Sequence, residues 1–406
     1  MEVEDHYAML LGIKSPWLIS NVDLKLDTQQ VDIVIEYADD TGSCPECGVT
    51  CAKHDNRKMR TWRHLDTMQF ATQLHCQLPR IHCKEHGAKT VNAPWAGKNS
   101  RFTLMFEAFA IRVLIAARSV EEARKLLGLN WHQVEAIKVR AVERGLKRRE
   151  EVEIPFIGID EKQFRSGHQY ISSIVDLQGG RVLDIVEERT EVACKTLISQ
   201  ALTAAQQKQV TAVALDMWKA YANAVNEKLP QADIVHDRFH ISQHLNEAVD
   251  KVRRQENKEL SEQGDNRLKG TKYHWLVNAE NLHGDHEESF EALRHSELKV
   301  SRAWAIKESF RYFWDYKYSA WAESYFDRWY SWAIRSRLKP IKAKARMIKT
   351  HLPNILTYFK HGISNAVAEG LNSKIQTVKS NARGYRSFNG FRNSILFYCG
   401  RLEMAP

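Results

Sequence analysis

Two short apolar runs that each end in an aspartate constrain the fold of this chain more than any other feature. They cover residues 154–160 (IPFIGID) and 210–216 (VTAVALD). Apolar runs of this length are typical of buried strands, and helical patterns lie on both sides of the second run. The alternation predicts an α/β sheet, and the strands of such a sheet end at a crevice where ligands bind. We therefore expect Asp160 and Asp216 to meet at one edge of the sheet.

The segments around these runs complete the predicted α/β region, residues 152–252. Gly179 and Gly180 form a hairpin turn between two strands. The remaining predicted strands are 170–176, 181–188 and 232–237, and the predicted helices are 193–206, 217–228 and 239–254. Residues 255–406 are predicted to be helical, and their last helix starts near Ser364.

Two converging carboxylates repel each other unless a cation lies between them. Mg²⁺ uses a few carboxylate oxygens and keeps several waters, which suits phosphodiester chemistry. Glu369 is the candidate for a third acid, one turn into the last predicted helix, with Asn372 on the same face. Asp237 is a rival because it also ends a predicted strand, and Asp176 is a weaker one. Each of these acids taken alone is explained more simply as a solvated surface carboxylate.

The first 95 residues hold five of the seven cysteines. Within them, Cys44/Cys47 and Cys83/His86 are pairs with the same spacing, and a glycine follows each pair. Two such pairs predict a closed, structural zinc site, which would organise a region whose two predicted strands, 31–37 and 73–78, cannot form a core alone. The other interpretation is free thiols and surface histidines. Other ligands, or a second ion, stay open: Cys51, His54, His64, His75, Cys76 and His82.

Residues 119–144 predict a pair of helices of the helix-turn-helix type. Ser119 is a plausible N-cap, Gly128 makes the turn, and the second helix begins at Trp131. The predicted core between the helices is Ala123, Leu126, Leu129, Val134 and Ile137. The side chains predicted to face DNA, the early ones toward base edges, are Trp131, His132, Gln133, Glu135, Lys138 and Arg140. A helical hairpin that only packs is an equally good interpretation of this segment alone.

Composition limits the class of protein but does not select its function. The net charge of +9 fits a polyanionic partner and equally fits an ordinary basic enzyme. No stretch reaches the roughly 20 apolar residues that span a membrane, and the acidic N-terminus does not resemble a signal peptide. We therefore expect a cytoplasmic protein without a membrane partner, in which the cysteines are thiols or metal ligands.

Taken together, these motifs resemble the insertion-sequence transposases of the ISL-three type over most of the chain. The resemblance also rests on Arg63-His64-Leu65, Ile157-Gly-Ile-Asp160-Glu, Asp216-Met-Trp-Lys-Ala-Tyr221, Asp237-Arg-Phe-His240, Ser364-Asn-Ala-Val-Ala-Glu369-Gly-Leu-Asn372, Gly384-Tyr385-Arg386 and Phe391-Arg392. His86 stands where many relatives carry a cysteine, and histidine binds zinc equally well.

The resemblance implies a multidomain α+β protein with an RNase H-like α/β core that an α-helical insertion interrupts. The long stretch between Asp216 and Glu369 leaves room for this insertion. The expected domains are a zinc-binding DNA-recognition domain (1–95), a helix-turn-helix domain (96–150), the first part of the catalytic core (151–255), the helical insertion (256–360) and the final helix of the core with the glutamate (361–406).

The implied activity is that of a DDE transposase, which binds double-stranded DNA at the transposon ends and joins them to target DNA. Asp160, Asp216 and Glu369 would hold Mg²⁺ or Mn²⁺ for strand cleavage and transfer, next to a structural Zn²⁺ site elsewhere in the chain. Asp237, His240 and Asn372 would lie beside these ligands and orient water or DNA. A homodimer is expected because two ends must be brought together. A non-catalytic DNA-binding regulator and a structure-specific nuclease are the alternatives.

Basic side chains outside the helix-turn-helix supply further candidates for DNA contacts. They lie in residues 335–349 and beyond Glu369: Lys342, Lys344, Arg346, Lys374, Lys379 and Arg383. An aromatic run covers residues 304–332. One or two of its rings are candidates for stacking on an unpaired base, although such a run more often forms a helical core.

Overall fold

The computed structural model describes residues 2–165, 167, 169–277, 280 and 285–406. None of the helices in these ranges has the length and apolar character that a bilayer crossing requires. Contacts divide the chain into two compact units, which we describe separately. The first unit comprises Met1–Arg149, Val378–Arg386 and Leu402–Pro406, and the second comprises Glu150–Thr377 and Ser387–Arg401.

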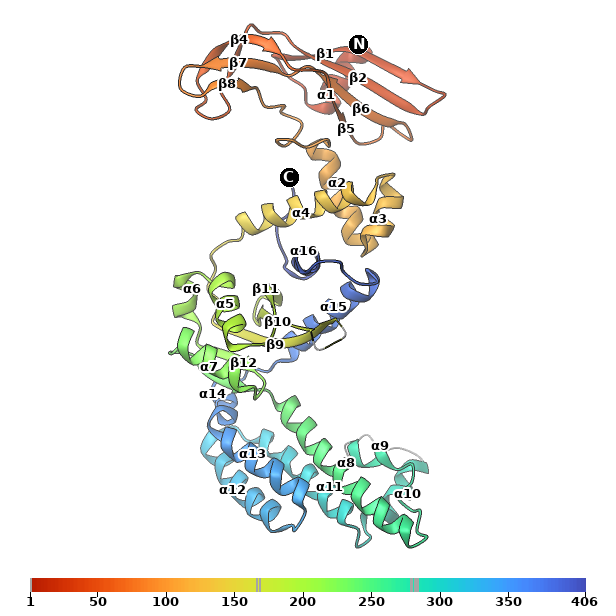
Figure 1. Cartoon of the computed structure of the whole chain (residues 1–406), viewed down its shortest axis with the longest axis vertical. Coiled ribbons are helices and arrows are strands. Elements are labelled where there is room, and N and C mark those ends of the chain that lie inside the picture. Colours follow the sequence, from red (N-terminus) through yellow and green to blue (C-terminus); the bar gives the residue numbers. More distant parts are fainter. Residues whose placement is uncertain (1, 166, 168, 278–279, 281–284) are drawn as a thin grey trace. The chain divides into compact units, whose positions relative to one another are not determined.

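Two four-stranded sheets form the N-terminal part of the first unit (Figure 1). The first sheet has the order β1-β2-β6-β5, with β2 and β6 parallel. Its elements, with the helix that precedes them, are α1 Val3–Leu11, β1 Trp17–Lys25, β2 Gln30–Tyr37, β5 Arg60–Arg63 and β6 Ala71–Cys76. The second sheet is antiparallel and has the order β3-β4-β7-β8. Its strands are β3 Thr41–Ser43, β4 Thr50–Asn56, β7 Pro79–Cys83 and β8 Gly87–Thr90.

The expectation that this region cannot form a core without metal is wrong. The side chains of Ile33, Ile35, Trp62, Leu74 and Trp95 are buried together in the first sheet. The two predicted strands correspond to β2 and β6; buried residues alternate along β6, whereas three successive residues of β2, Val31 to Ile33, are buried. The other strands escaped prediction because β1 is largely exposed and β4 is mostly polar, so neither carries a clear apolar alternation.

Three helices follow in the first unit: α2 Leu104–Ala117, α3 Val120–Leu127 and α4 Trp131–Lys147. The predicted cap and turn are confirmed: Ser119 Oγ accepts a hydrogen bond from the backbone N–H of Glu122, and Gly128 has φ of 62°. The predicted core is wrong at one position. Leu126 is 73% exposed, and Leu127 is buried in its place, because the helix phase turns Leu127 to the side of Ala123.

A five-stranded mixed sheet forms the centre of the second unit, with the order β11-β10-β9-β12-β13. β9, β10 and β11 pair antiparallel, whereas β9, β12 and β13 run parallel. The strands are β9 Phe156–Arg165, β10 Gln169–Asp176, β11 Arg181–Glu187, β12 Ala212–Leu215 and β13 Asp233–His236. The helices α5 Glu191–Ala201 and α7 Lys219–Lys228 pack on one face, through a core that includes Leu197 and Val225.

The structure corrects two predicted elements of this sheet region. β9 does not end at Asp160 but continues to Arg165, because its polar second half still pairs with β10. The predicted helix 193–206 is two helices, α5 and α6 Ala204–Gln209. Thr203 separates them, since its side chain forms a reciprocal cap with Gln206 that starts a new helix.

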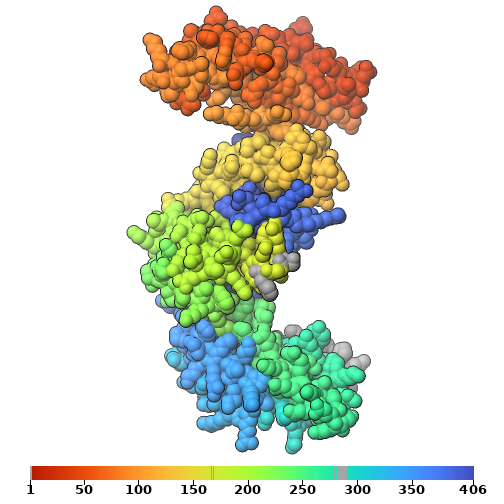
Figure 2. All heavy atoms as spheres, in the orientation of Figure 1, coloured from red at the N-terminus to blue at the C-terminus, as the bar shows by residue number. Residues whose placement is uncertain are grey.

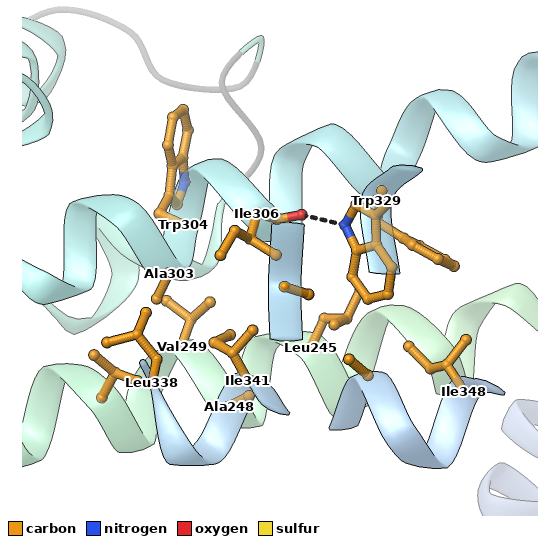
Figure 3. Close-up of a cluster of buried hydrophobic side chains, with 14 of the residues drawn as sticks. Leu245, Ala248, Val249, Ala303, Trp304, Ile306, Trp329, Leu338, Ile341 and Ile348 are labelled. Carbon is orange, nitrogen blue, oxygen red and sulfur yellow. Dashed lines mark hydrogen bonds between the residues drawn. The ribbon is translucent and has the colours of Figure 1, made fainter. Parts of the chain in front are cut away.

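Residues 238–361 form a helical segment with its own hydrophobic core (Figure 3). The helices are α8 Arg238–Glu262, α9 Lys272–Leu276, α10 Asp285–Arg294, α11 Lys299–Phe310, the 3-10 helix η2 Arg311–Asp315, α12 Ser319–Arg335, α13 Lys339–Leu356 and α14 Tyr358–His361. Trp329 Nε1 donates a hydrogen bond of 2.8 Å to Ile306 O within this core. The space-filling view shows one face of the described part of this segment (Figure 2). Trp321 and Trp332 stay outside the core, at 64% and 43% exposure.

The chain closes with α15 Ala366–Asn381 and α16 Phe388–Cys399. The helix that carries Glu369 is therefore not the last one, contrary to expectation. Ser387 caps α16, and Arg392 on this helix binds the buried Asp184 of β11 through two hydrogen bonds of 2.6 and 2.7 Å. α16 thus packs against β11 at the edge of the sheet.

Candidate functional site

Side-chain alternation along the sheet places two predicted acids on one face. Ile157 and Ile159 of β9 point into the core that α5 and α7 cover, so Asp160 points to the opposite face. Leu215 of β12 belongs to the same core, and Asp216 follows it directly. Asp216 therefore points to the face of Asp160, because successive side chains of a strand point to opposite sides.

The strand register brings three aspartates to one level of this face. The parallel register of β9 and β12, continued by two residues, pairs Asp160 with Asp216. The parallel register of β12 and β13, continued by one residue, pairs Asp216 with Asp237. Neighbouring strands lie about 4.8 Å apart. We call these three residues, together with Glu369, the carboxylate row.

Helix α15 carries Glu369 and Asn372 to the row. Asn372 Nδ2 donates a hydrogen bond to Asp160 Oδ2. The buried Asn365, just before α15, packs against Gly158 of β9, where a Cβ atom would lie 2.9 Å from Asn365 Oδ1. The glycine thus permits the close approach of the chain before α15 to β9. This approach places Glu369 near Asp160.

The carboxylates of the row oppose one another's ionisation. Burial, reinforced by the Asp237 and Asp160 carboxylates, raises the pKa of Glu369. Burial also raises the pKa of Asp160, and the Asp216 carboxylate adds to the increase. Glu369 Oε1 and Asp237 Oδ2 are buried and have no hydrogen-bond partner among the described residues. Buried oxygens without donors, in a group of like charges, have the chemistry that bound cations require.

The three residues predicted to lie beside the metal ligands are all at the row. Asn372 contacts Asp160, and His240 lies close enough to lower the pKa of both Asp160 and Glu369 through its charge. Asp237 is 4% exposed and caps α8, where its Oδ1 accepts a 3.2 Å hydrogen bond from Phe239 N. What these three residues do in a reaction stays a prediction.

The sequence analysis missed Glu161 and Arg189, which lie beside the row. Glu161 Oε1 accepts a hydrogen bond of 2.8 Å from Arg189, whose guanidinium lies 4.0 Å from the ring centre of Tyr170 and 5.2 Å from that of Trp218. Trp218 Nε1 donates to Arg189 O at 3.2 Å. The position of Glu161 directly after Asp160 was a signal in the sequence, whereas Arg189 offered none.

A second candidate site lies in the first unit, where Cys44, Cys47, Cys83 and His86 come together. Their ligand atoms all lie within 4.8 Å of one another, and no carboxylates form such a group among the described residues. The sulfurs of Cys47 and Cys83 are 3.7 Å apart, and Cys83 Sγ lies 3.6 Å from His86 Nδ1. Two sulfurs bound to one tetrahedral zinc would be roughly 3.8 Å apart. The geometry therefore fits a zinc ion.

The ionisation of the thiols also fits a cation. Hydrogen bonds from the backbone and side chain of His86 lower the pKa of Cys83 to about 6. For Cys47, the backbone N–H of Val49 lowers the pKa, but burial and the thiols of Cys44 and Cys83 outweigh it and raise the pKa to about 11. Neighbouring thiols cannot all ionise unless a cation compensates their charge.

The alternative ligands considered in the sequence have other surroundings. His64 Nδ1 lies 2.9 Å from Thr103 Oγ1, and His75 Nε2 lies 2.8 Å from Asp32 Oδ1. Cys76 is buried in the core of the first sheet. His54 lies 3.5 Å from Asp55, while Cys51 and His82 lie outside the four-residue group.

Comparison with known proteins assigns these sites to a family. A transposase family model of the ISL3 type matches residues 157–395, more than half of the chain, and this range includes all the acids of the row. The chain belongs to the ISL3 family of transposases. The model of the zinc finger of transposases IS204, IS1001, IS1096 and IS1165 matches residues 40–86, and that of the helix-turn-helix domain of family ISL3 matches residues 91–142.

Two relatives that match over most of their length are named as transposases. The transposase for insertion sequence element IS1001 of Bordetella parapertussis is 26% identical over 347 residues, which cover 84% of this chain and 85% of the relative. The transposase for insertion sequence element IS1557 of Mycobacterium tuberculosis is 29% identical over 369 residues, or 85% of this chain and 82% of the relative. The family resemblance drawn from the motifs is therefore confirmed.

The second helix of the predicted helix-turn-helix is α4, and the structure changes the surface of this helix that was expected to face DNA. Trp131 is 48% exposed and His132 is also exposed, as predicted. Gln133 Oε1 accepts a 2.9 Å hydrogen bond from Asn130 N, so its side chain caps the helix. Lys138 is only 1% exposed, contrary to expectation, because positions 134, 137, 138 and 141 share the buried stripe of α4.

Arg140, also predicted to face outward from α4, is half-buried and paired with an acid. Arg140 Nε donates a 3.1 Å hydrogen bond to Glu107, a buried residue of α2. The charge of Arg140 is thus compensated within the protein, and its contact with DNA stays a prediction. Lys138 Nζ is similarly held 2.8 Å from Glu135. The Lys138–Glu135 pair is three residues apart on one helix and follows from the helix period, whereas the sequence pattern could not show the pairing of Arg140 with Glu107 of α2.

The basic residues of the second half of the chain that were predicted to contact DNA differ in exposure and in ion pairing. On α13, Arg346 is exposed and Lys342 is half-buried, whereas Lys344 binds Glu247 at 2.9 Å. Lys374 on α15 is exposed, Lys379 is half-buried, and Arg383 is exposed with φ of 53°. Their contacts with DNA stay predictions.

Proposed function

We propose that this transposase binds the ends of its insertion sequence and catalyses metal-dependent cleavage and joining of DNA strands at the carboxylate row. The observation that carries the proposal is the convergence of Asp160, Asp216 and Glu369 on one face, with the buried Glu369 Oε1 left without a donor among the described residues. The names of the relatives, transposases for insertion sequence elements, support the DNA substrate.

Three acids of the row would bind metal in this proposal, and two neighbouring residues would assist them. Asp160, Asp216 and Glu369 would hold two divalent cations, Mg²⁺ or Mn²⁺, which supply an activated water and stabilise the leaving 3′ oxygen. Asn372 Nδ2 donates to Asp160 Oδ2 and Glu161 N donates to Asp160 Oδ1 at 2.8 Å, so both oxygens of this carboxylate are oriented. The His240 side chain lies close to Asp160 and Glu369, where anionic phosphate oxygens would lie.

We further propose that the five-stranded sheet is an RNase H-like core and that residues 238–361 are its helical insertion. The strand order, with an antiparallel hairpin unit beside two parallel strands, supports the first point. The separate hydrophobic core of the helical segment supports the second. The insertion separates Asp237 from Glu369 in the sequence, while both residues belong to the row. A homodimer would bring two transposon ends together.

The catalytic proposal is tested with purified protein, labelled DNA from the ends of its own element, and Mg²⁺ or Mn²⁺. Asp216→Asn removes a metal ligand, so strand cleavage and joining should fall by roughly 10³-fold or more while end binding persists. Asp327→Asn, an exposed carboxylate on α12, is the matched control and should keep full activity. Equal activity of Asp216→Asn and wild type would refute the assignment.

The same experiment separates the alternatives. Specific end binding without cleavage by the wild-type protein would favour a DNA-binding regulator. Cleavage of branched DNA without joining would favour a structure-specific nuclease. Joining of the cut ends to a target duplex is expected only of a transposase.

We propose that Cys44, Cys47, Cys83 and His86 bind a structural zinc ion. Metal analysis should find one zinc per chain, and Cys83→Ser should lose it, whereas Cys51→Ser should retain it because Cys51 is outside the group. The first sheet should keep its circular dichroism signal after zinc removal, since its hydrophobic core is separate from these ligands. Full retention of zinc by Cys83→Ser would contradict the assignment.

A further inference from the structure

A hollow of about 870 Å³ lies in the first unit, between the edge of the first sheet and the turn of the helix-turn-helix. Residues of β5 and β6 form one side, and Leu127, Gly128 and Leu129 form the other. Its polar lining residues are mainly hydrogen-bond donors or cations: Arg60, Arg63, Gln73, Asn99, Arg101 and Gln133. None of the lining residues in the described part of the chain is acidic.

The three arginines differ in how much of their charge is compensated. Arg63 binds Asp66 and lies 5.3 Å from the ring centre of Phe106. Arg60 donates a 3.2 Å hydrogen bond to Ser100 O and lies 4.8 Å from the ring centre of Trp62, and it forms no ion pair with a carboxylate of the described residues. Arg101 is exposed, and the structure shows no hydrogen bond or ion pair from its side chain to the described residues. The hollow therefore holds two uncompensated positive charges.

Hydrogen bonds tie the arginine-bearing segment to the sheet. Arg63 N donates to Arg101 O at 2.9 Å, and Thr103 N donates to Arg63 O at 3.0 Å. The side chains of His64 and Thr103 lie 2.9 Å apart, and Thr103 also caps α2. Because the same short segment joins β5 and starts α2, the spacing between the sheet and the helices is fixed on this side of the hollow.

We propose that this hollow binds the phosphate backbone of duplex DNA, beside the groove that α4 reads. The proposal rests on the proposed DNA-binding function and adds a contact surface outside the recognition helix. In a helix-turn-helix complex, the first residues of the recognition helix face base edges, so the adjoining turn faces the flanking backbone. A cationic hollow without carboxylates, located at this turn, matches a polyanionic strand.

The contact would be independent of sequence, because phosphates carry no base information. Arg60 and Arg101 would each neutralise one phosphate, and each would then contribute about 0.9 to the slope of log affinity against log salt concentration. Trp131 and His132 at the start of α4 are exposed and remain available for base edges. The hollow would thus bind phosphates, and the start of α4 would contact bases.

The test measures binding of the full chain to two fluorescent duplexes, the end of its own element and a scrambled sequence, without divalent cations and over a series of KCl concentrations. Arg101→Gln should weaken binding to both duplexes by the same factor, several-fold near 0.1 M salt, and reduce the salt slope by roughly 0.9. Arg60→Gln should act in the same way. His132→Ala should instead weaken binding mainly to the element end.

Arg112→Gln is the matched control, since Arg112 is an exposed arginine of α2 that does not line the hollow. It should leave affinity and slope unchanged. An unchanged slope for Arg101→Gln, or an equal loss for Arg112→Gln, would overturn the proposal. Failure of the wild type to prefer its own end, with Arg101→Gln still reducing the slope, would count against the proposed function and for the hollow. Absence of DNA binding by the wild type would overturn both.

Discussion

The carboxylate of Asp237 has two candidate roles, capping of α8 and binding of a cation, and they require different properties. Its Oδ1 accepts a hydrogen bond from Phe239 N at the start of α8, whereas its Oδ2 is buried without a partner among the described residues. Its charge also contributes to the raised pKa of Glu369. Capping needs only one oxygen, and asparagine caps a helix as well as aspartate does. Cation binding needs the negative charge.

Asp237→Asn separates these two roles. The variant should keep α8 capped, and it should raise the melting temperature of the metal-free protein because one repelling charge is removed. We expect its Mn²⁺ affinity to fall about tenfold or more. Titration calorimetry with Mn²⁺ and thermal melting measure both effects. An unchanged Mn²⁺ affinity would leave Asp237 with the capping role alone.

His64 makes the stability of the first unit depend on pH. Burial, reinforced by the charge of Arg63, lowers the pKa of His64 to about 4. The unfolded chain binds this proton near pH 6.5, whereas the folded state binds it only near pH 4. Stability is therefore fully present above about pH 6.5 and is lost as the pH falls toward 4, by up to roughly 3 kcal/mol.

Denaturant unfolding at pH 7 and pH 4.5 measures this effect. His64→Gln cannot take up the proton, so its free energy of unfolding should fall less between the two pH values than that of the wild type. His54→Gln is a suitable control because His54 is exposed. The same pH dependence in His64→Gln and wild type would show that other groups cause it.

At the scale of elements, the contact between β9 and the chain before α15 decides whether the carboxylate row can form. A Cβ atom at Gly158 would lie 2.9 Å from both Asn365 Oδ1 and Val175 Cγ2. Gly158→Ala should therefore destabilise the protein by about 1–3 kcal/mol and reduce strand cleavage, because α15 must shift. Gly370→Ala is the matched control: its Cβ meets nothing within 4 Å, and alanine stabilises a helix interior by roughly 1 kcal/mol.

Melting temperature and cleavage rate together check this prediction. A stable Gly158→Ala variant with full activity would show that the approach of α15 tolerates a methyl group. Gly370→Ala is compared by melting temperature only, since Gly370 directly follows Glu369.

In the first unit, helices were more predictable than strands, for a local reason. Ser119, Gly128 and Asn130 mark the ends of α3 and the start of α4 through contacts within four residues. The strands of the first unit depend on partners far apart in the sequence, such as the parallel pair β2 and β6. β9 likewise extends past Asp160 because β10 pairs with its polar half.

At the scale of the whole molecule, the chain returns to its first unit near residue 402. A Cβ atom at Gly145 of α4 would lie 2.7 Å from Leu402 Cβ, and Arg144 Nε donates a 3.1 Å hydrogen bond to Met404 O. Gly145→Ala should therefore lower the melting temperature, although helix propensity alone would raise stability by about 1 kcal/mol. The sign of the change in a thermal melt decides whether this packing exists in solution.

The sequence alone determined the features that depend on spacing between near neighbours. These are the two Cys/His pairs, the apolar runs before Asp160 and Asp216, and the helix-turn-helix with its caps. The family resemblance drawn from these motifs was enough to indicate a transposase.

Only the tertiary structure decided which of these residues lie close together and which charged side chains have no ion-pair partner among the described residues. Strand register brought Asp237 to the same level as Asp216, and Gly158 allowed α15 to approach. Glu107 compensates Arg140, whereas Arg101 keeps its charge at the hollow. Register, close approach and charge pairing all join residues distant in the chain, so no local pattern can encode them.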